Sequence, residues 1–230
     1  MLKDKKRKRT LIIFAKEPKP HRVKTRLSKD FPPLWVTNLY KAFLKDILKK
    51  ARRVRCHERF IYHAGSLSLP FLKKFKKDFL YAAQRGRNLG ERMSRAFERH
   101  QKHGYARTVI IGADCPMMSI NYINRAFQKL DRYDMVLGPC PDGGYALVGL
   151  KDVSPALFKG IPWSSAHVLS KTLSVAKRLR KSVYLLEELE DIDHQESLKR
   201  LSRHKNLKKM ARYTWNMMQR FSYEDAKATL

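Results

Sequence analysis

The sequence VIIGADCP, residues 109–116, is an apolar run that delivers one carboxylate and then meets a proline. This pattern predicts a buried strand that stops at Pro116. A second run, LGPCPDGGYALVG at residues 137–149, is strand-like on both sides of a turn that holds Asp142. Aspartate bonds its own backbone and glycine accepts positive φ, so the turn predicts a hairpin. Glycine also lets backbone approach a ligand closely, and on this segment alone both interpretations stay open.

The two segments share one property, which is a carboxylate placed next to the end of a predicted strand. Asp114 follows the first strand directly, and Asp142 lies in the turn after the second. In open α/β sheets, ligands bind outside the carboxyl ends of the strands. The pair therefore predicts a metal or phosphate site at one edge of a sheet.

Strand-like and helix-like patterns alternate along the rest of the chain. The predicted strands cover residues 10–15, 59–63, 79–83, 108–111, 135–138, 145–149 and 183–186. The predicted helices cover residues 34–53, 69–77, 89–102, 120–130, 166–179 and a last group from 196 to 219. Strands separated by helices of this length indicate crossover connections, and hence an α/β fold whose mostly parallel sheet is covered on both faces. We expect one domain over residues 10–230, after a disordered basic arm at 1–9.

Composition favours a globular protein of the cytoplasm. Hydrophobic residues make up 43% of the 230 residues, and no apolar run approaches the length of a membrane span. The basic N-terminus precedes an apolar segment too short for a signal peptide, so secretion is not expected. The three cysteines, Cys56, Cys115 and Cys140, form no Cys-x-x-Cys pair and suit a reducing compartment.

The charge is strongly positive, with 50 Lys and Arg against 21 Asp and Glu and a net charge of +29. Such an excess is typical of nucleic-acid binders. Here it is spread along the whole chain, and there is no zinc finger, RNP-type strand or Gly-x-x-Gly clamp. Nucleic acid is therefore not expected as the main ligand, whereas a basic proteome or an anionic substrate would explain the charge equally well.

A basic loop follows the first predicted strand. Five of its side chains between residues 16 and 26 are cationic, namely Lys16, Lys19, Arg22, Lys24 and Arg26. Arginine forks and lysine point charges beside a strand end suit a di- or triphosphate. The alternative is a solvated loop in a basic protein. No Gly-x-x-x-x-Gly-Lys motif is present, which argues against a Walker-type ATPase.

Three further groups of residues are candidates for metal binding, helix capping or a surface position. Asp191 and Asp193 lie on one side of an extended segment, where they suit Mg²⁺ or Mn²⁺, although either could instead cap the next helix. Residues 164 and 165 are serines, predicted to cap the helix that starts near residue 166. His100 and His103 have no carboxylate partner nearby in sequence and are expected on the surface.

Seven segments in order resemble the DUF2064 family, over roughly residues 10–200. They are FAK at 14–16, RVKTRL at 22–27, LGERM at 89–93, IGADCP at 111–116, GPCPDGGY at 138–145, WS at 163–164 and DID at 191–193. The resemblance implies a glycosyltransferase of the selenodomain-associated or arsenosugar-biosynthesis type. The family is similar to 2-phospholactate guanylyltransferase and molybdenum cofactor guanylyltransferase.

The resemblance implies a GT-A fold, the three-layer sandwich of nucleotide-diphospho-sugar transferases, and a bound Mg²⁺ or Mn²⁺. It implies metal ligation by Asp114 and Asp193. It implies phosphate binding by Lys16, Arg22, Lys24, Thr25 and Arg26. It implies sugar or acceptor contacts by Asp142, Gly143, Gly144, Tyr145, Trp163 and Ser164. The chain departs from the family pattern at His21, where glycine is usual, and at Ser165, where threonine is usual.

The leading hypothesis is a metal-dependent glycosyltransferase that uses a nucleotide-diphosphate sugar and an unidentified small-molecule acceptor. Lys24 would act on the phosphates, and Asp142 would orient the acceptor or act as its base. The alternative within the same fold is transfer of a nucleotide from an NTP to a phosphorylated small molecule. Outside the enzymes, a non-catalytic RNA-binding protein stays open. The sequence carries no prediction of the oligomeric state.

Overall fold

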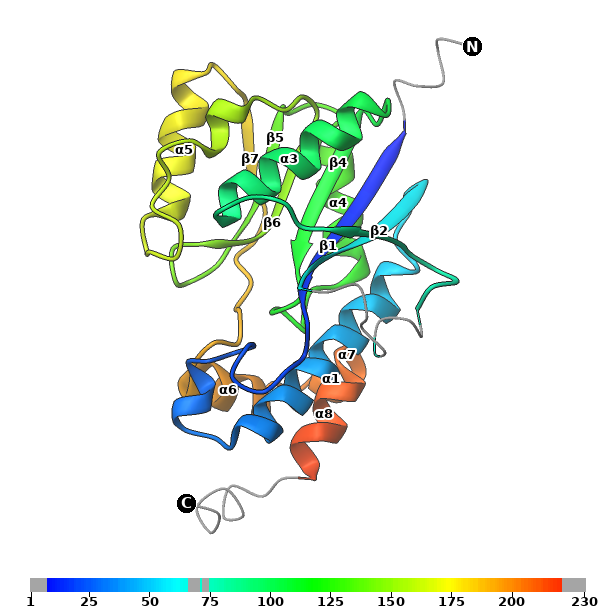
Figure 1. The fold of residues 1–230 in the computed structure, drawn as a ribbon, viewed down its shortest axis with the longest axis vertical. Coiled ribbons are helices and arrows are strands. Elements are labelled where there is room, and N and C mark those ends of the chain that lie inside the picture. The colour runs from blue at the N-terminus through cyan, green and yellow to red at the C-terminus, as the bar shows by residue number, and fades with distance from the viewer. Residues whose placement is uncertain (1–7, 66–70, 72–74, 221–230) are drawn as a thin grey trace.

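One seven-stranded sheet organises the computed structural model, which describes residues 8–65, 71 and 75–220 (Figure 1). The strand order is β3-β2-β1-β4-β6-β5-β7. Every neighbouring pair is parallel except those made by β6, which runs antiparallel to both β4 and β5. The strands are β1 (Arg9–Lys16), β2 (Glu58–Ala64), β3 (Leu80–Ala83), β4 (Arg107–Gly112), β5 (Met135–Pro139), β6 (Tyr145–Leu150) and β7 (Val183–Leu185). The predicted α/β class with a mostly parallel sheet is confirmed.

Helices cover both faces of the sheet, which gives the three layers of the predicted sandwich (Figure 1). One face carries α1 (Pro33–Ala51) and α4 (Ile120–Lys129). The helices α6 (Gln195–Ser202), α7 (Leu207–Met210) and α8 (Arg212–Gln219) contribute to the same core, and α8 packs against α1. The other face carries α3 (Leu89–Lys102), α5 (Val168–Arg178) and the 3₁₀ turn η3 (Pro155–Phe158). A further 3₁₀ turn, η2 (Leu27–Lys29), precedes α1.

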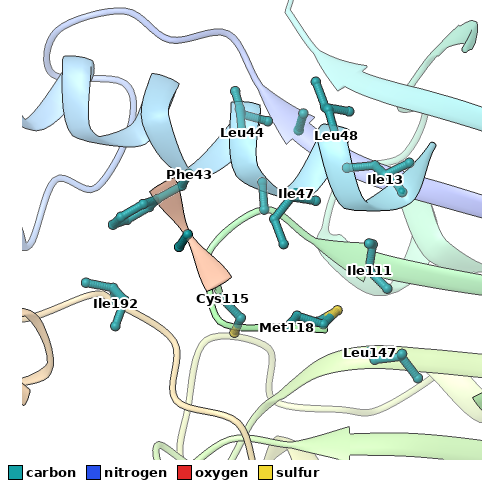
Figure 2. Packing of buried hydrophobic residues seen from close by; sticks show 14 of the residues in the cluster. Ile13, Phe43, Leu44, Ile47, Leu48, Ile111, Cys115, Met118, Leu147 and Ile192 are labelled. Carbon is teal, nitrogen blue, oxygen red and sulfur yellow. The ribbon is translucent and has the colours of Figure 1, made fainter. Parts of the chain in front are cut away.

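The larger core forms because α1 presents a continuous apolar stripe to the sheet. Phe43, Leu44, Ile47 and Leu48 recur at helical spacing and are fully buried. Figure 2 shows this stripe facing strand residues of β1, β4 and β6. Cys115 and Ile192, which lie beyond the strands, belong to the same cluster (Figure 2). The loops at the carboxyl edge of the sheet are therefore fixed to the core.

Backbone hydrogen bonds hold three segments side by side at that edge. The predicted hairpin joins β5 to β6, and its turn is closed by Cys140 N–H donating to Gly144 O at 3.0 Å. The segment after β7 bonds to the end of β5 and to the loop after β4. Leu189 N–H donates to Pro139 O at 2.9 Å, and Ile192 N–H donates to Asp114 O at 3.1 Å. Asp114, Asp142 and the 189–193 segment are thus brought together by the sheet.

Some local predictions do not hold. α5 begins at Val168, with His167 as its N-cap, so neither predicted serine caps it. Ser165 instead stabilises the preceding turn, with its Oγ donating to the Pro162 carbonyl at 2.8 Å. His100 is buried, because α3 presents it to the aromatic ring of Phe60. Burial lowers the pKa of His100 to about 4.

Two predictions fall mostly where the structure gives no description. The helix predicted over 69–77 lies largely outside the described residues, and so do residues 1–7 of the predicted arm. Arg9, at the end of that arm, is the first residue of β1. None of the described helices is both long and apolar enough to cross a lipid bilayer.

Candidate active site

A cleft of about 690 Å³ opens at the carboxyl ends of β1, β4 and β5. It lies where β4 and the antiparallel strand β6 meet, at the position where ligands bind in open α/β sheets. The predicted site residues that line it are Lys16, Lys24, Thr25, Arg26, Asp114, Asp142, Gly144, Tyr145, Trp163, Ser164 and Asp193. Arg22 and Gly143 do not line the cleft.

The basic loop after β1 is anchored so that one lysine turns inward. Val23 and Leu27 are buried in the main core on either side of Lys24. Lys24 has a φ of +47°, and His21 earlier in the loop has a φ of +60°. Both angles lie in the left-handed region, which side chains other than glycine adopt at a cost. The strained backbone and the two apolar anchors direct the Lys24 side chain into the floor of the cleft.

The Lys24 ammonium bridges the two carboxylates predicted to hold a metal. Its Nζ lies 2.7 Å from Asp114 Oδ1 and 2.6 Å from Asp193 Oδ1. Only 2% of the lysine side chain is exposed, against 47% for Asp114 and 32% for Asp193. Burial alone would lower the pKa of Lys24, but the two carboxylates outweigh it and raise that pKa. Burial would raise the pKa of Asp193, yet Lys24 keeps it below its ordinary value.

Two other cations of the loop, Lys16 and Arg26, lie at the mouth of the cleft. Arg26 is exposed, with its Nη1 3.6 Å from Asp193 Oδ2. Lys16 is exposed at the end of β1, where its N–H donates to the buried hydroxyl of Tyr40 at 2.9 Å. Thr25, between the buried Lys24 and the exposed Arg26, is also exposed. These groups face solvent at the cleft, whereas Arg22 is exposed away from its lining.

A second group of residues with metal-ligating side chains lines the same cleft. One ligand atom from each of Cys140, Asp142 and Asp191 lies within 4.8 Å of the other two. Asp142 is exposed in the hairpin turn, where its Oδ1 accepts the Gly144 N–H at 2.8 Å. Burial, followed by the charges of Asp142 and Asp193, raises the pKa of Asp191 to about 6. Neither predicted helix-cap role applies to the 191–193 pair, because His194 is the N-cap of α6.

Two aromatic side chains, Tyr145 and Trp163, form part of the cleft wall. Tyr145 and Trp163 meet edge to face with ring centroids 6.4 Å apart. The indole of Trp163 lies so close to Gly90 that a Cβ there would collide with it. Gly143 has a φ of +82°, and a Cβ there would collide with the Ala166 carbonyl. The two glycines therefore allow close packing of the wall, and Gly143 does so without facing the cleft.

Several lining residues were not predicted from the sequence. Gln84 donates through Nε2 to the carbonyls of Tyr62 and Ala15, at 2.8 and 3.2 Å, and so fixes the floor beside β1. Arg92 lies in the lining at the start of α3, with its Nε donating to Gly86 O at 3.1 Å. Arg92 belongs to the LGERM segment, so the family motif carried a signal for it. Gln84 lies in no such motif.

Several solved structures share this architecture. A candidate nucleotide-diphospho-sugar transferase from Desulfovibrio desulfuricans G20 is 31% identical, with a TM-score of 0.84 over 92% of this chain and 94% of that chain. CMP:2-keto-3-deoxy-manno-octonic acid synthetase, solved with CTP, is 9% identical, with a TM-score of 0.58 over 93% of this chain and 100% of that chain. Its likeness concerns the fold alone.

A third neighbour is glucosyl-3-phosphoglycerate synthase from Mycobacterium tuberculosis, solved with Mn²⁺, UDP and glucosyl-3-phosphoglycerate. It is 10% identical, with a TM-score of 0.53 over 93% of this chain and 79% of that chain, and again shares the fold. The chain belongs to the DUF2064 family, described as uncharacterized proteins conserved in bacteria, whose model matches residues 47–165. No curated protein sequence matches it.

Proposed function

We propose that this protein is a divalent-metal-dependent glycosyltransferase that takes a nucleotide-diphosphate sugar as its donor. The observation that carries the proposal is the Lys24 ammonium, held 2.6 to 2.7 Å from two carboxylate oxygens beneath a cleft with a cationic mouth. A floor that binds a cation beside exposed Lys16 and Arg26 suits a diphosphate with its metal. Three free cysteines agree with action in the cytoplasm.

The residues present fit a Mg²⁺ or Mn²⁺ ion. Asp114 Oδ1 and Asp193 Oδ1 already converge on one positive charge, and oxygen ligands are what these ions prefer. Asp114 and Asp193 would hold the metal, which when bound neutralises charge on the leaving diphosphate. Lys24 would then turn from the carboxylates to the phosphate oxygens, so that its charge stays balanced.

The remaining residues divide the work of binding and proton transfer. Lys16, Thr25 and Arg26 would bind phosphate oxygens, and Arg22 is proposed as an outer contact because it is exposed and does not line the cleft. Gly144, Tyr145, Trp163 and Ser164 would contact the sugar and the acceptor.

Asp142 is exposed at the edge of the cleft and would accept the proton of the acceptor hydroxyl. The acceptor oxygen then bonds the sugar carbon as the bond from that carbon to the diphosphate breaks. Gly143 would support the turn that carries Asp142.

A panel of donors tests the proposal directly. Thermal melting is measured with Mg²⁺ or Mn²⁺ and UDP-sugars, GDP-sugars, GTP or CTP. One of the nucleotide sugars should raise the melting temperature of the wild type, because it binds only the folded chain. Asp114→Ala should abolish that rise, whereas an equal rise in the variant would contradict the metal assignment.

Product analysis separates glycosyl transfer from the other hypotheses. Release of a free nucleoside diphosphate is expected, and pyrophosphate release from an NTP would instead establish nucleotidyl transfer to a phosphorylated small molecule. Stabilisation by RNA that survives in Asp114→Ala, without any response to nucleotides, would indicate a non-catalytic RNA-binding protein.

A further inference from the structure

We propose that a basic face formed by α1 and α8 binds single-stranded nucleic acid, as a ligand additional to the substrates of the cleft. The face consists of Lys41, Lys45 and Lys49 of α1, together with Tyr213 of α8 and Arg220 at the end of α8. None of these residues lines the cleft. A strand bound there would leave the cleft open, so this inference does not rest on the proposed function.

The three lysines form the part of α1 that its neighbours leave uncovered. Most residues of α1 are buried against the sheet and α8, whereas Lys41 and Lys45 are half-buried and Lys49 is exposed. The three recur every four positions, so their side chains leave the helix on one side, about 6 Å apart. A line of cations along one side of a helix is the electrostatic footprint of a nucleic-acid-binding surface.

The positive charge of this face is not neutralised within the described part of the chain. The only acidic residue of α1 is Asp46, and residues 197–220 contain none. Asp46 is buried and accepts the N–H groups of Tyr213 and Thr214 at 3.1 and 2.8 Å, so it fixes α8 against α1. Within residues 8–65, 71 and 75–220, none of the four cations of the face forms an ion pair with a carboxylate. A polyanion would supply the missing negative charge.

Tyr213 adds an aromatic ring to the line of lysines. Its side chain is 41% exposed, and the Nζ atoms of Lys45 and Lys49 lie 5.6 and 5.8 Å from its ring centroid. Cation–π attraction of this kind holds the ring among the ammonium groups. A base that stacks on the exposed ring would bring its phosphates to those groups. Arg220 lies seven positions after Tyr213, on the same side of α8, and extends the face.

The composition of the face favours nucleic acid over an anionic membrane. A membrane-binding helix inserts several large apolar side chains into the lipid interface. On the described α1 and α8, the exposed large hydrophobic residues are Leu34 and Tyr213 alone. One leucine and one tyrosine offer little area to insert, whereas an aromatic ring within a line of cations suits a single strand.

Fluorescence anisotropy of the full chain with a labelled oligouridylate or oligothymidylate tests the proposal. Both should bind, because the face contacts phosphates and base planes. Replacing Lys41, Lys45 and Lys49 together with Gln should weaken binding about tenfold or more. It should also lower the slope of log K against log salt by about 2, since each phosphate contact of a single strand contributes about 0.7.

The matched control removes the same charge from the opposite side of the sheet. Lys159, Lys171 and Lys177 are exposed, and α5 and η3, which carry or precede them, cover the other face (Figure 1). Their combined replacement with Gln should leave the affinity within about twofold of the wild type. Equal weakening in the two triple variants would overturn the proposal, because diffuse charge would then explain the binding. Absence of binding to the wild type would also overturn it.

Two substitutions at Tyr213 separate stacking from charge. Tyr213→Ala should weaken binding about fivefold or more, whereas Tyr213→Phe keeps the ring and should retain the affinity. Both variants keep the backbone bond to Asp46. Unchanged affinity in Tyr213→Ala would reduce the face to unspecific charge and overturn the proposal. Should the triple lysine variant fail to fold, Lys49→Gln should lower the salt slope by about 0.7, and an unchanged slope would overturn it.

Two further measurements distinguish other ligands and the cleft. Sedimentation with phosphatidylserine vesicles that the triple lysine variant loses, without binding of either oligonucleotide, would assign the face to a membrane and overturn the proposal. Asp114→Ala should bind the oligonucleotides as the wild type does, and weaker binding would place the strand in the cleft instead. Binding that depends on the basic face in a wild type that ignores nucleotides and metal would support this inference and contradict the transferase proposal.

Discussion

The cleft holds two pairs of carboxylates, and among the described residues only one pair, Asp114 and Asp193, has a buried cation as its partner. Asp114 and Asp193 share the buried ammonium of Lys24 at 2.7 and 2.6 Å. Asp142 and Asp191 lie beside a thiol instead, and burial with crowding raises the pKa of Asp191 to about 6. The pKa of Asp191 is thus raised and that of Asp193 lowered, although the two residues are two positions apart. The cause is that Asp193 forms an ion pair with Lys24 from the loop after β1.

The difference shows that the Lys24 ammonium is what allows Asp114 and Asp193 to lie close together as charged carboxylates. Without its ammonium, Asp114 and Asp193 would repel each other as Asp142 and Asp191 do. Under the proposed function, Lys24 would exchange places with the metal and move to the phosphates. Among the described residues, no lysine or arginine forms an ion pair with Asp142 or Asp191 in the second pair.

Replacing Lys24 should have the largest effect, because it removes the distinction between the pairs. In Lys24→Met, we expect transfer to fall about 100-fold or more, since a buried donor to developing phosphate charge is lost. The pKa of Asp193 should rise, which NMR titration of its carboxylate measures. Lys19→Met is the control from the same loop, because Lys19 is exposed and pairs only with Glu17 at 3.0 Å among the described residues. Near-normal transfer in Lys24→Met would contradict the account.

A substitution in the hairpin turn should disturb only the second pair. Gly143→Ala forces a side chain onto a φ of +82° and into the Ala166 carbonyl. We expect the free energy of unfolding to fall by about 2 kcal/mol or more, measured by urea denaturation. Gly160→Ala shares a positive φ of +68° but meets no atom within 4 Å, and should cost about 1 kcal/mol. Equal losses would show that the turn has room for a side chain.

Replacing Asp191 with the neutral Asn should change the stability of the protein by an amount that depends on pH. Its folded pKa of about 6 lies above the unfolded value near 3.9, so the native state binds the proton more tightly. Its contribution to stability therefore falls as the pH rises from about 4 to about 6. Asp191→Asn should raise the melting temperature of the metal-free protein more at pH 7.5 than at pH 4.5. A gain independent of pH would contradict the raised pKa.

The pH response of Asp193 should have the opposite sign. Its folded pKa lies below its ordinary value, so its contribution is present at neutral pH and is lost as the pH falls through the folded pKa. Asp193→Asn should therefore destabilise the protein at pH 7.5 and less at low pH. Melting curves of both variants across the same pH series make the comparison.

The smallest effect is expected at the exposed end of the first pair. Arg26 lies 3.6 Å from Asp193 and is 47% exposed, so solvent screens the interaction. Arg26→Gln should change the free energy of unfolding by less than about 1 kcal/mol. A loss comparable to that of Lys24→Met would mean that the outer cation, and not the buried one, neutralises the pair.

Much of the architecture could be predicted, because local pattern decides it. Apolar runs indicated the strands, helical spacing indicated α1 and α4, and the Pro-Asp-Gly-Gly turn indicated the β5–β6 hairpin. The order of strands could not be derived, since pairing of β6 with β4 depends on long-range contacts. Cys115 and Cys140 therefore gave no sign of their proximity. The surface position predicted for His100 was wrong because its aromatic neighbours come from β2, far away in the sequence.

The sequence predicted which residues belong to the candidate site better than it predicted how they are arranged. The basic loop and the strand-end carboxylates follow from residue type and position. That Lys24 alone turns inward depends on the burial of Val23 and Leu27 and on a positive φ, which no short motif encodes. Arg22 illustrates the limit, because it is four positions before Arg26 and yet does not line the cleft.

The most direct test of the central claim compares two substitutions that lie two residues apart. Mn²⁺ binding in the presence of the stabilising nucleotide is measured by electron paramagnetic resonance for Asp193→Asn and Asp191→Asn. If Asp114 and Asp193 form the nucleotide-metal site, Asp193→Asn should weaken Mn²⁺ binding at least about tenfold more than Asp191→Asn. Equal weakening, or a larger loss in Asp191→Asn, would contradict the assignment.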